Sequence, residues 1–274
     1  MAINYASKYA SNVDERFRLG AVTTPAINNN FDWVGVKTVQ VYSVPTVALG
    51  DYTRTGANRY GTPSELDNTL QELTLSQDKA FTFTIDRGNY EDTMMVNAAG
   101  SALQREIDEV VIPTLDIYRL AKMAASAGKT VTGAVDKTNA YDAFLDATAY
   151  MTDNKVPLEG RMAYISPAFY KAIKQDETFI KASDVAQEML VRGMVGMVDG
   201  IRLITVPTSY LPENTMFMVT HPVATVAPVK LADYQVHDNP PGINGWLVEG
   251  RIYYDAFVLN NKKNIIYVHN TTAA

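Results

Sequence analysis

The chain has 274 residues, 47% of them hydrophobic, which is enough to bury a sizeable core in one or two domains. Its formal charge of −6 and pI near 5.1 argue against a nucleic-acid-reading surface, because such surfaces are usually basic. The absence of cysteine excludes disulfides, thiolate metal sites and cysteine nucleophiles. The sequence shows neither a secretory signal nor an apolar stretch long enough for a membrane helix. We therefore expect a soluble protein, made inside the cell, with no membrane partner.

Residues 1–30 predict an N-terminal arm. They mix small, polar and charged residues, and they show no sustained period of 2 or 3.6. A frayed terminus is one interpretation. An arm that lies over a partner subunit is the other.

Two β-type segments separated by turn-forming residues predict an extended ribbon. The outgoing strand is expected over residues 34–42, and the return strand over 73–75 and 81–85. Residues 50–63 between them are rich in turn formers, and a shift in the apolar phase predicts a β-bulge near Lys37. A lone hairpin is marginal in water and its bare edges pair with other chains, so neighbouring copies would complete it. An ordinary meander inside one sheet is the alternative.

A period of three and four residues predicts one long helix over residues 90–127. The apolar positions that recur on one face are Met95, Ala99, Leu103, Ile107, Val110, Thr114, Ile117, Ala121 and Ala124. At 1.5 Å per residue this helix would be about 57 Å long, more than the roughly 48 Å diameter of a compact globule of this chain length. Pro113 predicts a kink, because an internal proline removes a helix hydrogen bond. Gly128 predicts the helix end.

Residues 129–247 predict a separate α/β unit, followed by a C-terminal β-hairpin. Asn139 and Ser166-Pro167 are typical of helix starts. The other expected elements are strands over 162–165, 201–207 and 216–219, a helix over 182–191, and a loop over 239–245. The hairpin is expected from strands over 246–259 and 264–268, joined by residues 260–263.

Motifs for catalysis or for metal binding are missing from the sequence. The segment Gly128-Lys129-Thr130 lacks the earlier glycine of a phosphate-binding loop, and the glycines between 193 and 200 precede a strand where the dinucleotide motif would follow one. The three histidines, His221, His237 and His269, lie singly, without metal-ligand spacing. No Gly-x-Ser-x-Gly elbow is present. We therefore expect no enzyme and no catalytic, cofactor-binding or metal-binding residue.

The order of the predicted parts resembles that of the major capsid proteins of tailed bacteriophages, the Hong Kong ninety-seven type capsid fold. The segment 109–119 is similar to the spine helix of that family. Its matching residues are Glu109, Pro113, Asp116, Tyr118 and Arg119. Residues 249–259 resemble the closing strand of the family's peripheral (P) domain, and residues 193–207 resemble the entry to a central strand of its axial (A) domain.

This resemblance implies an α+β fold with five parts. They are an N-terminal arm (1–30), an extended β-hairpin called the E-loop (31–88), the spine helix of the P-domain (89–128), an α/β A-domain (129–247) and the terminal β-strands of the P-domain sheet (248–274). The resemblance further implies pentamers and hexamers that form an icosahedral shell around double-stranded DNA. The protein would be part of the virion capsid and would assemble in the bacterial host cytoplasm. An acidic chain suits a shell that holds DNA by closure, without sequence-specific binding.

The resemblance also predicts partners and contacts. The sequence shows no long helical scaffolding segment, so we expect a separate scaffolding protein or none, with a portal and decoration proteins as further partners. Some relatives join subunits through lysine–asparagine bonds, but the ribbon tip has only arginines, so this chemistry is not expected here. The expected intersubunit contacts are Tyr52, Arg54, Arg59 and Tyr60, the arginines reaching acidic groups on a neighbour.

Three other functions fit parts of the sequence. An encapsulin, a nanocompartment shell protein, would share the fold but would enclose a cargo protein in place of DNA. A two-domain α+β small-molecule enzyme with its site in residues 129–247 would be a small oligomer that a ligand stabilises. A tail-tube or adhesin subunit would form rings or fibres instead of closed shells.

Overall fold

The computed structural model describes residues 21–28, 30, 38–43, 47–63, 65, 69–92, 98–177, 179 and 196–272. The chain divides into a ribbon unit, Trp33–Leu75, and a body made of Met1–Asp32 and Ser76–Ala274. Three predictions lie outside the described residues: the helix over 182–191, the start of the outgoing ribbon strand, and the bulge at Lys37. Residues 1–20 of the predicted arm also lie outside them.

The ribbon unit is an antiparallel pair of strands, β1 (Thr38–Ser43) and β2 (Thr69–Thr74). The register runs without a break from Thr38 opposite Thr74 to Ser43 opposite Thr69. Threonine hydroxyls of the first pair lie 2.9 Å apart, and the Gln40 amide donates to Glu72 at 3.0 Å. The expected two-stranded ribbon is therefore confirmed, with a shorter return strand than predicted.

The body contains a three-stranded antiparallel sheet in the order β10-β11-β3. Its strands are β10 (Val229–Asp238), β11 (Gly245–Tyr254) and β3 (Gln77–Asp86). This sheet corrects two predictions. Residues 81–85 do not continue the ribbon, because Phe83 lies opposite Val248 of β11. Residues 229–238, expected in the α/β unit, pair with the same strand.

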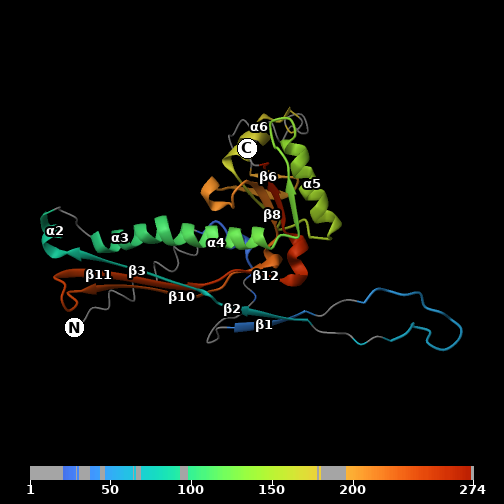
Figure 1. Cartoon of the computed structure of the whole chain (residues 1–274), viewed down its shortest axis with the longest axis horizontal. Coiled ribbons are helices and arrows are strands. Elements are labelled where there is room, and N and C mark those ends of the chain that lie inside the picture. Colours follow the sequence, from blue (N-terminus) through green and yellow to red (C-terminus); the bar gives the residue numbers. More distant parts are fainter. Residues whose placement is uncertain are drawn as a thin grey trace. The chain divides into compact units, whose positions relative to one another are not determined.

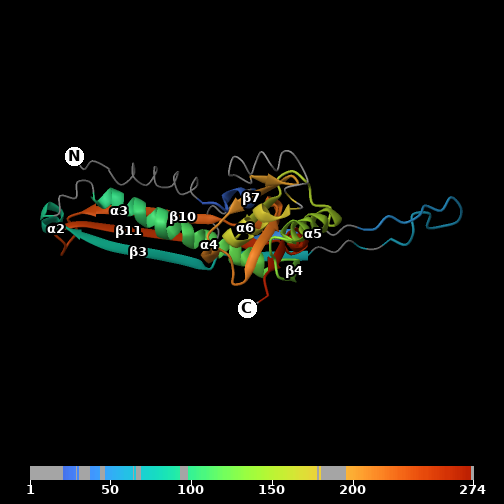
Figure 2. The ribbon, with the colours of Figure 1, turned by 90° about the horizontal axis from the view of Figure 1, so that it is seen from above.

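The long helix is built from α3 (Ala98–Glu106), the π-helical turn η2 (Ile107–Val111) and α4 (Ile112–Ala125), which follow one another without a break and lie along the three-stranded sheet (Figure 1, Figure 2). The start predicted at residue 90 falls in a separate short helix, α2 (Arg87–Asp92), at the end of β3, and residues 93–97 lie outside the described residues. The irregularity predicted at Pro113 lies in the turn before it. Proline has no N–H to donate, and the Ile112 N–H instead reaches back five residues to the Ile107 carbonyl.

The π-helical turn changes which side chains are buried. Leu103 and Ile107 are buried as predicted, but Val110 and Ile117 are exposed. The predicted face is thus wrong after residue 107, because a π-helical turn holds one extra residue and rotates the following positions by about 100°. The residues of α4 that are buried in its place are Ile112, Leu115, Asp116, Arg119, Leu120 and Met123.

This shift of face predicts a difference between two neighbouring positions. Leu115→Ala should lower the free energy of unfolding by about 2–5 kcal/mol, because Leu115 is fully buried. Ile117→Ala should change it by only about 0.5 kcal/mol, as at other surface positions. Urea unfolding of the unassembled subunit measures both. Equal losses of stability in the two variants would contradict the shift of face. They would indicate that the apolar period of the sequence continues unbroken through the helix.

The second sheet of the body has six strands in the order β4-β13-β8-β5-β7-β6. They are β4 (Lys129–Thr132), β13 (Tyr267–Asn270), β8 (Thr215–Thr220), β5 (Met162–Ile165), β7 (Ile201–Thr205) and β6 (Met197–Val198). The strands predicted over 162–165, 201–207 and 216–219 are confirmed as β5, β7 and β8, with β7 ending at Thr205. The predicted C-terminal hairpin is wrong: a 3₁₀ helix, η5 (Asn260–Ile265), follows the short strand β12 (Phe257–Val258), and β13 pairs with β4 and β8.

Gly128 is required at the start of this sheet for a reason other than the predicted helix end. Helix α4 ends at Ala125 with Ser126 as its C-cap, and the Gly128 N–H donates to the carbonyls of Lys263 and Ile266 at 2.9 and 3.1 Å. A Cβ at position 128 would lie 2.6 Å from the Asn264 backbone. The two chain segments can approach this closely only because the residue is glycine.

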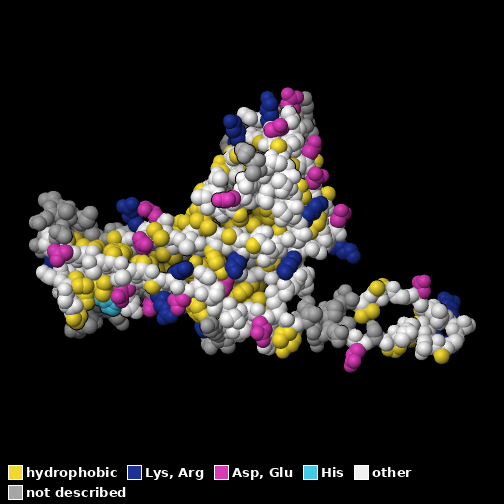
Figure 3. Space-filling view, viewed as in Figure 1, with side chains coloured by type: hydrophobic (Ala, Val, Ile, Leu, Met, Phe, Trp, Pro, Cys, Tyr) yellow, Lys and Arg dark blue, Asp and Glu magenta, His cyan; other side chains and the backbone are white. Residues whose placement is uncertain are grey.

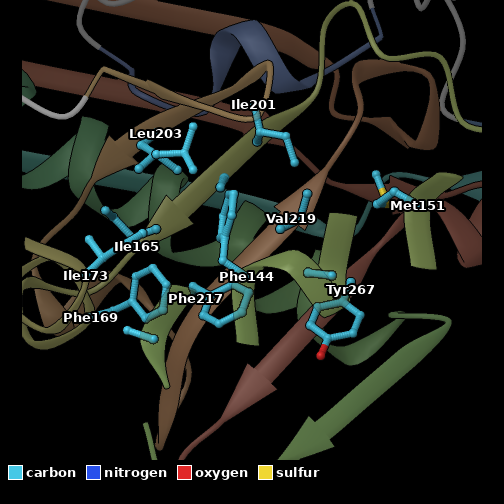
Figure 4. Packing of buried hydrophobic residues seen from close by; sticks show 14 of the residues in the cluster. Phe144, Met151, Ile165, Phe169, Ile173, Ile201, Leu203, Phe217, Val219 and Tyr267 are labelled. Atoms are coloured by element: carbon cyan, nitrogen blue, oxygen red, sulfur yellow. The ribbon is translucent and has the colours of Figure 1, made fainter. Parts of the chain in front are cut away.

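Helices α5 (Ala140–Asp153) and α6 (Pro167–Gln175) pack on one face of the six-stranded sheet, where Figure 4 shows aromatic and aliphatic side chains meeting. Ser166 caps α6 as predicted, accepting from the Phe169 N–H at 3.2 Å. Asn139 precedes α5 as predicted, but its side chain makes no cap. The Asp176 carboxylate instead accepts the Tyr141 N–H at 2.9 Å.

Helix α4 packs on the opposite face of the same sheet. Leu120 and Met123 share a buried cluster with Met218 and Val268 of the sheet and with Ala26 of the N-terminal segment. The short elements η1 (Thr24–Ala26), η3 (Thr208–Tyr210), η4 (Pro222–Ala224) and β9 (Thr225–Val226) surround this cluster. Helix α4 thus contributes buried residues to the clusters of both sheets of the body.

Candidate assembly site

The motif residue Asp116 binds the N-terminal segment. It lies on α4 and is only 1% exposed. Its carboxylate accepts the N–H groups of Val22 and Thr23 at 3.0 and 3.2 Å, and the Thr23 hydroxyl at 2.5 Å. Residues 21–28 are therefore part of the packed body, which argues against a fully frayed terminus for that stretch.

Arg119 completes this buried junction one helical turn later. It is 3% exposed, and its guanidinium donates to the Thr23 hydroxyl at 3.1 Å and to the Ala227 carbonyl at 3.4 Å. Burial lowers the pKa of Arg119 to about 10, so the side chain stays charged at neutral pH. Burial also raises the pKa of Asp116, against the opposing effect of its hydrogen bonds to Thr23 and Val22. Two charged groups and one threonine thus hold the segment to the helix.

Tyr118 forms a second junction at another side of α4. Its hydroxyl donates to Asp255 at 2.7 Å, and Asp255 also accepts from the backbone and side chain of Ser76. Burial and the Asp255 carboxylate both raise the pKa of Tyr118, so the phenol stays protonated and able to donate. This junction joins the spine helix to the start of β3.

The remaining motif residues have different roles. Pro113 follows the π-helical turn, and Glu109 is an exposed partner of Arg105 at 3.1 Å. Such exposed pairs add little stability. Sequence reasoning missed Thr23, Ser76 and Asp255, whose partners lie between 93 and 179 residues away along the chain. No local pattern could have identified them.

The ribbon tip presents exposed aromatic and basic side chains. The rings of Tyr52 and Tyr60 meet edge to face with centroids 5.0 Å apart, although Tyr52 is 51% exposed and Tyr60 92%. The Thr53 N–H donates to the Arg59 carbonyl at 3.1 Å, and both Arg54 and Arg59 are exposed. Figure 3 shows Lys and Arg side chains at this end of the ribbon. The structure thus brings the four predicted contact residues together, and tyrosine and arginine are enriched in interface hot spots.

Apolar side chains are also exposed along the ribbon strands. Tyr42 and Leu70 lie directly opposite each other in the pair of strands, and both are exposed. Leu49 and Val47 are exposed in the connection that follows β1. A narrow two-stranded sheet with such side chains has little core of its own and gains stability when a partner covers it.

One face of the three-stranded sheet is polar and hollowed. The hollow is lined by side chains of Asp233, Gln235, Glu249 and Arg251, together with Ala80 and Thr82. Arg251 pairs with Asp78 at 2.6 Å. Gly250 and Phe81 also line the hollow, and only glycine fits at position 250, because a Cβ there would lie 2.3 Å from the Phe81 ring. Two carboxylates thus line the hollow: Glu249, whose Oε2 lies 3.3 Å from His237 Nε2, and Asp233, which accepts the Gln235 amide at 3.2 Å.

Within the described ranges, no group of His, Asp and Glu side chains could hold a metal ion. In the same part of the chain, no helix is long and apolar enough to cross a membrane.

A long helix packed between a three-stranded sheet and a six-stranded α/β unit, with a separate ribbon, is the architecture of tailed-phage capsid subunits. The chain belongs to the phage capsid protein family, whose model matches residues 71–268. It is a structural capsid protein, and the α+β capsid fold expected from the sequence is confirmed. A search of curated proteins found no match to the sequence.

Solved structures share this fold at low sequence identity. A protein of Mycobacterium phage Che8 is 18% identical, with 91% of each chain covered and a TM-score of 0.68. The capsid structure of cyanophage P-SCSP1u gives 15% identity, 88% of this chain and 85% of that chain covered, and a TM-score of 0.71. A virus-like particle from Pyrococcus furiosus is 11% identical, with 98% of this chain and 100% of that chain covered and a TM-score of 0.62.

Proposed function

We propose that this chain is the major subunit of a closed icosahedral shell, assembled from pentamers and hexamers around double-stranded DNA. The observation that carries the proposal is the match of residues 71–268 to phage capsid proteins in a chain whose ribbon unit leaves apolar side chains uncovered. The role is structural and not enzymatic. The shell is the virion capsid, and it assembles in the cytoplasm of the bacterial host.

The proposed partners follow from the shell. The chain contacts copies of itself, and a separate scaffolding protein, a portal and decoration proteins complete the particle. With a formal charge of −6, the subunit holds DNA by closure and without sequence-specific binding. Electron microscopy of the purified chain tests the central claim, with closed shells of icosahedral symmetry as the expected result. A small oligomer of fixed size, stabilised by a small molecule, would contradict it.

A nanocompartment shell is the second candidate function. The fold does not separate it from a virion, because a virus-like particle from Pyrococcus furiosus matches over 98% of this chain. The content of particles isolated from their native source separates the two candidates. Nuclease-protected double-stranded DNA supports the virion, whereas a single enriched cargo protein supports the nanocompartment.

We further propose that the four residues of the ribbon tip contact a neighbouring subunit. Tyr52 and Tyr60 supply the apolar area, and the arginines bind carboxylates such as those of the hollow on the three-stranded sheet. Tyrosine and arginine side chains of this kind give much binding energy once a partner excludes water from them.

Charge reversal at the ribbon tip tests this contact. Shells of the double variant Arg54→Glu, Arg59→Glu should melt at a lower temperature than wild-type shells, because like charges then meet at the interface. The loss should be larger at low salt, where screening is weaker. Calorimetry of intact shells measures it. The matched control, Arg54→Lys with Arg59→Lys, keeps the charge, so its melting temperature should fall less. If the tip binds the hollow, adding Asp233→Lys and Glu249→Lys to the charge-reversed variant should restore the melting temperature of the shells. An unchanged melting temperature in the reversed variant would show that the arginines are only solvated surface charges.

A further inference from the structure

The chain passes from the ribbon unit to the body between Leu75 and Ser76. Ser76 is held at this point by its backbone and by its side chain. Its N–H donates to Asp255 Oδ2 at 2.8 Å, and its hydroxyl donates to the same oxygen at 2.7 Å. The first residue of the body after the ribbon is therefore fixed by one carboxylate.

The other oxygen of this carboxylate is also fully used. Asp255 Oδ1 accepts the Tyr118 hydroxyl at 2.7 Å and the Ala256 N–H at 2.8 Å. Asp255 is 2% exposed, and within the described part of the chain no lysine, arginine or histidine forms an ion pair with it. A buried carboxylate that depends on neutral donors is sensitive to the loss of each one.

Tyr118 connects this carboxylate to helix α4. Its ring meets Tyr254 edge to face with centroids 5.4 Å apart, and the Lys122 ammonium lies 5.3 Å from the ring centroid. Helix α4, which carries Tyr118 and Lys122, packs against both sheets. Ser76 is thus joined to the spine helix through a single acidic side chain.

We propose that Asp255 is a positioning residue for shell assembly: it fixes Ser76, the first residue of the body after the ribbon and here called the joint, onto the spine helix. The inference rests on the proposed function, because only an assembled shell uses the ribbon. A joint that is ordered in the free subunit reduces the conformational entropy lost when the ribbon binds a neighbour. A loosened joint should leave the body folded and slow the assembly.

The variant Ser76→Ala tests the inference with little disturbance, because Ser76 is exposed and keeps its backbone N–H. In the unassembled subunit, backbone amides of residues 73–78 should exchange hydrogen about tenfold faster or more, since a hydrogen bond to a charged group is lost. Shell yield should fall. Ser76→Thr retains the hydroxyl and should restore both properties.

Thr138 provides a matched control elsewhere in the body. Its N–H and hydroxyl both donate to one oxygen of Asp136, at 2.7 and 2.5 Å, as those of Ser76 do to Asp255, but this carboxylate is exposed and only two residues away. Thr138→Ala therefore removes the same kind of hydrogen bond far along the chain from the joint. It should leave exchange at 73–78 and shell yield unchanged.

The outcomes separate a positioning role from a merely structural one. Faster exchange at the joint together with poor assembly, in Ser76→Ala but not in Thr138→Ala, supports the proposal. Equal assembly of the two variants, or wild-type assembly of Ser76→Ala, overturns it. Tyr118→Phe is a second variant, which removes a donor from the other carboxylate oxygen and should give the same pattern. Hydrogen exchange is measured in the unassembled subunit and tests the joint alone. A wild-type chain that forms no shells would instead contradict the proposed function.

Discussion

Deletion of residues Gly50–Gly61 is expected to give a folded subunit that no longer closes shells. The deleted loop is exposed along its whole length, and none of its residues belongs to a buried cluster of the body. The melting temperature of the unassembled subunit should therefore stay within a few degrees of wild type, because a surface change is worth about 0.5 kcal/mol or less. Under the proposed function the same deletion removes Tyr52, Arg54, Arg59 and Tyr60, so electron microscopy should show open or irregular assemblies.

A length-matched variant makes this prediction sharper. Replacing residues 52–60 by glycine and serine keeps the reach of the ribbon but removes its aromatic and basic side chains. If contacts at the tip are responsible, this variant should fail in the same way as the deletion. Normal shells from the deletion would rule out any role of the tip in closure. Normal shells from the length-matched variant alone would assign that role to the reach of the ribbon.

The order of elements could be predicted because its signals are local. Turn formers, a period of two and a period of three to four each act over a few residues, and they located the ribbon, the long helix and most strands of the α/β unit. Strand partners could not be predicted in the same way. Phe83 pairs with Val248, and Tyr267 pairs with Lys129 and Val219. The period of a strand fixes which face is buried, but it says nothing of which distant strand lies beside it.

The sequence predicted only some residues of the candidate site, because contacts between distant residues have no local pattern. The resemblance to capsid proteins pointed to Asp116, Tyr118 and Arg119, and all three occupy junctions of α4. Their partners Thr23 and Asp255 carry no pattern of their own, because one hydrogen bond across a hundred residues leaves no local trace. Pro113 predicted an irregularity, but the π-helical turn before it, which changes the buried face, has no pattern of its own in the sequence.

The largest loss of stability is expected from breaking the buried junction between α4 and the N-terminal segment. Asp116→Ala leaves the Arg119 guanidinium buried without its anionic neighbour, and it removes the acceptor of three hydrogen bonds from Val22 and Thr23. A hydrogen bond to a charged group contributes about 1.5–3 kcal/mol, so losing the three that Asp116 accepts should cost about 3 kcal/mol or more. Urea unfolding of the unassembled subunit should show this loss, and Arg119→Ala should show one of similar size.

The junction should behave as a unit when both charges are replaced. The double variant Asp116→Leu, Arg119→Met should lose less stability than the two alanine variants added together, because no unpaired charge remains in the core. Glu109→Ala is the matched control, since it removes an exposed carboxylate from the same spine helix and should change little. Additive losses in the double variant would mean that the two buried charges act independently. A loss in Asp116→Ala no larger than that in Glu109→Ala would mean that apolar packing of Ala26 and Ile27, and not the charged junction, holds residues 21–28 to the body.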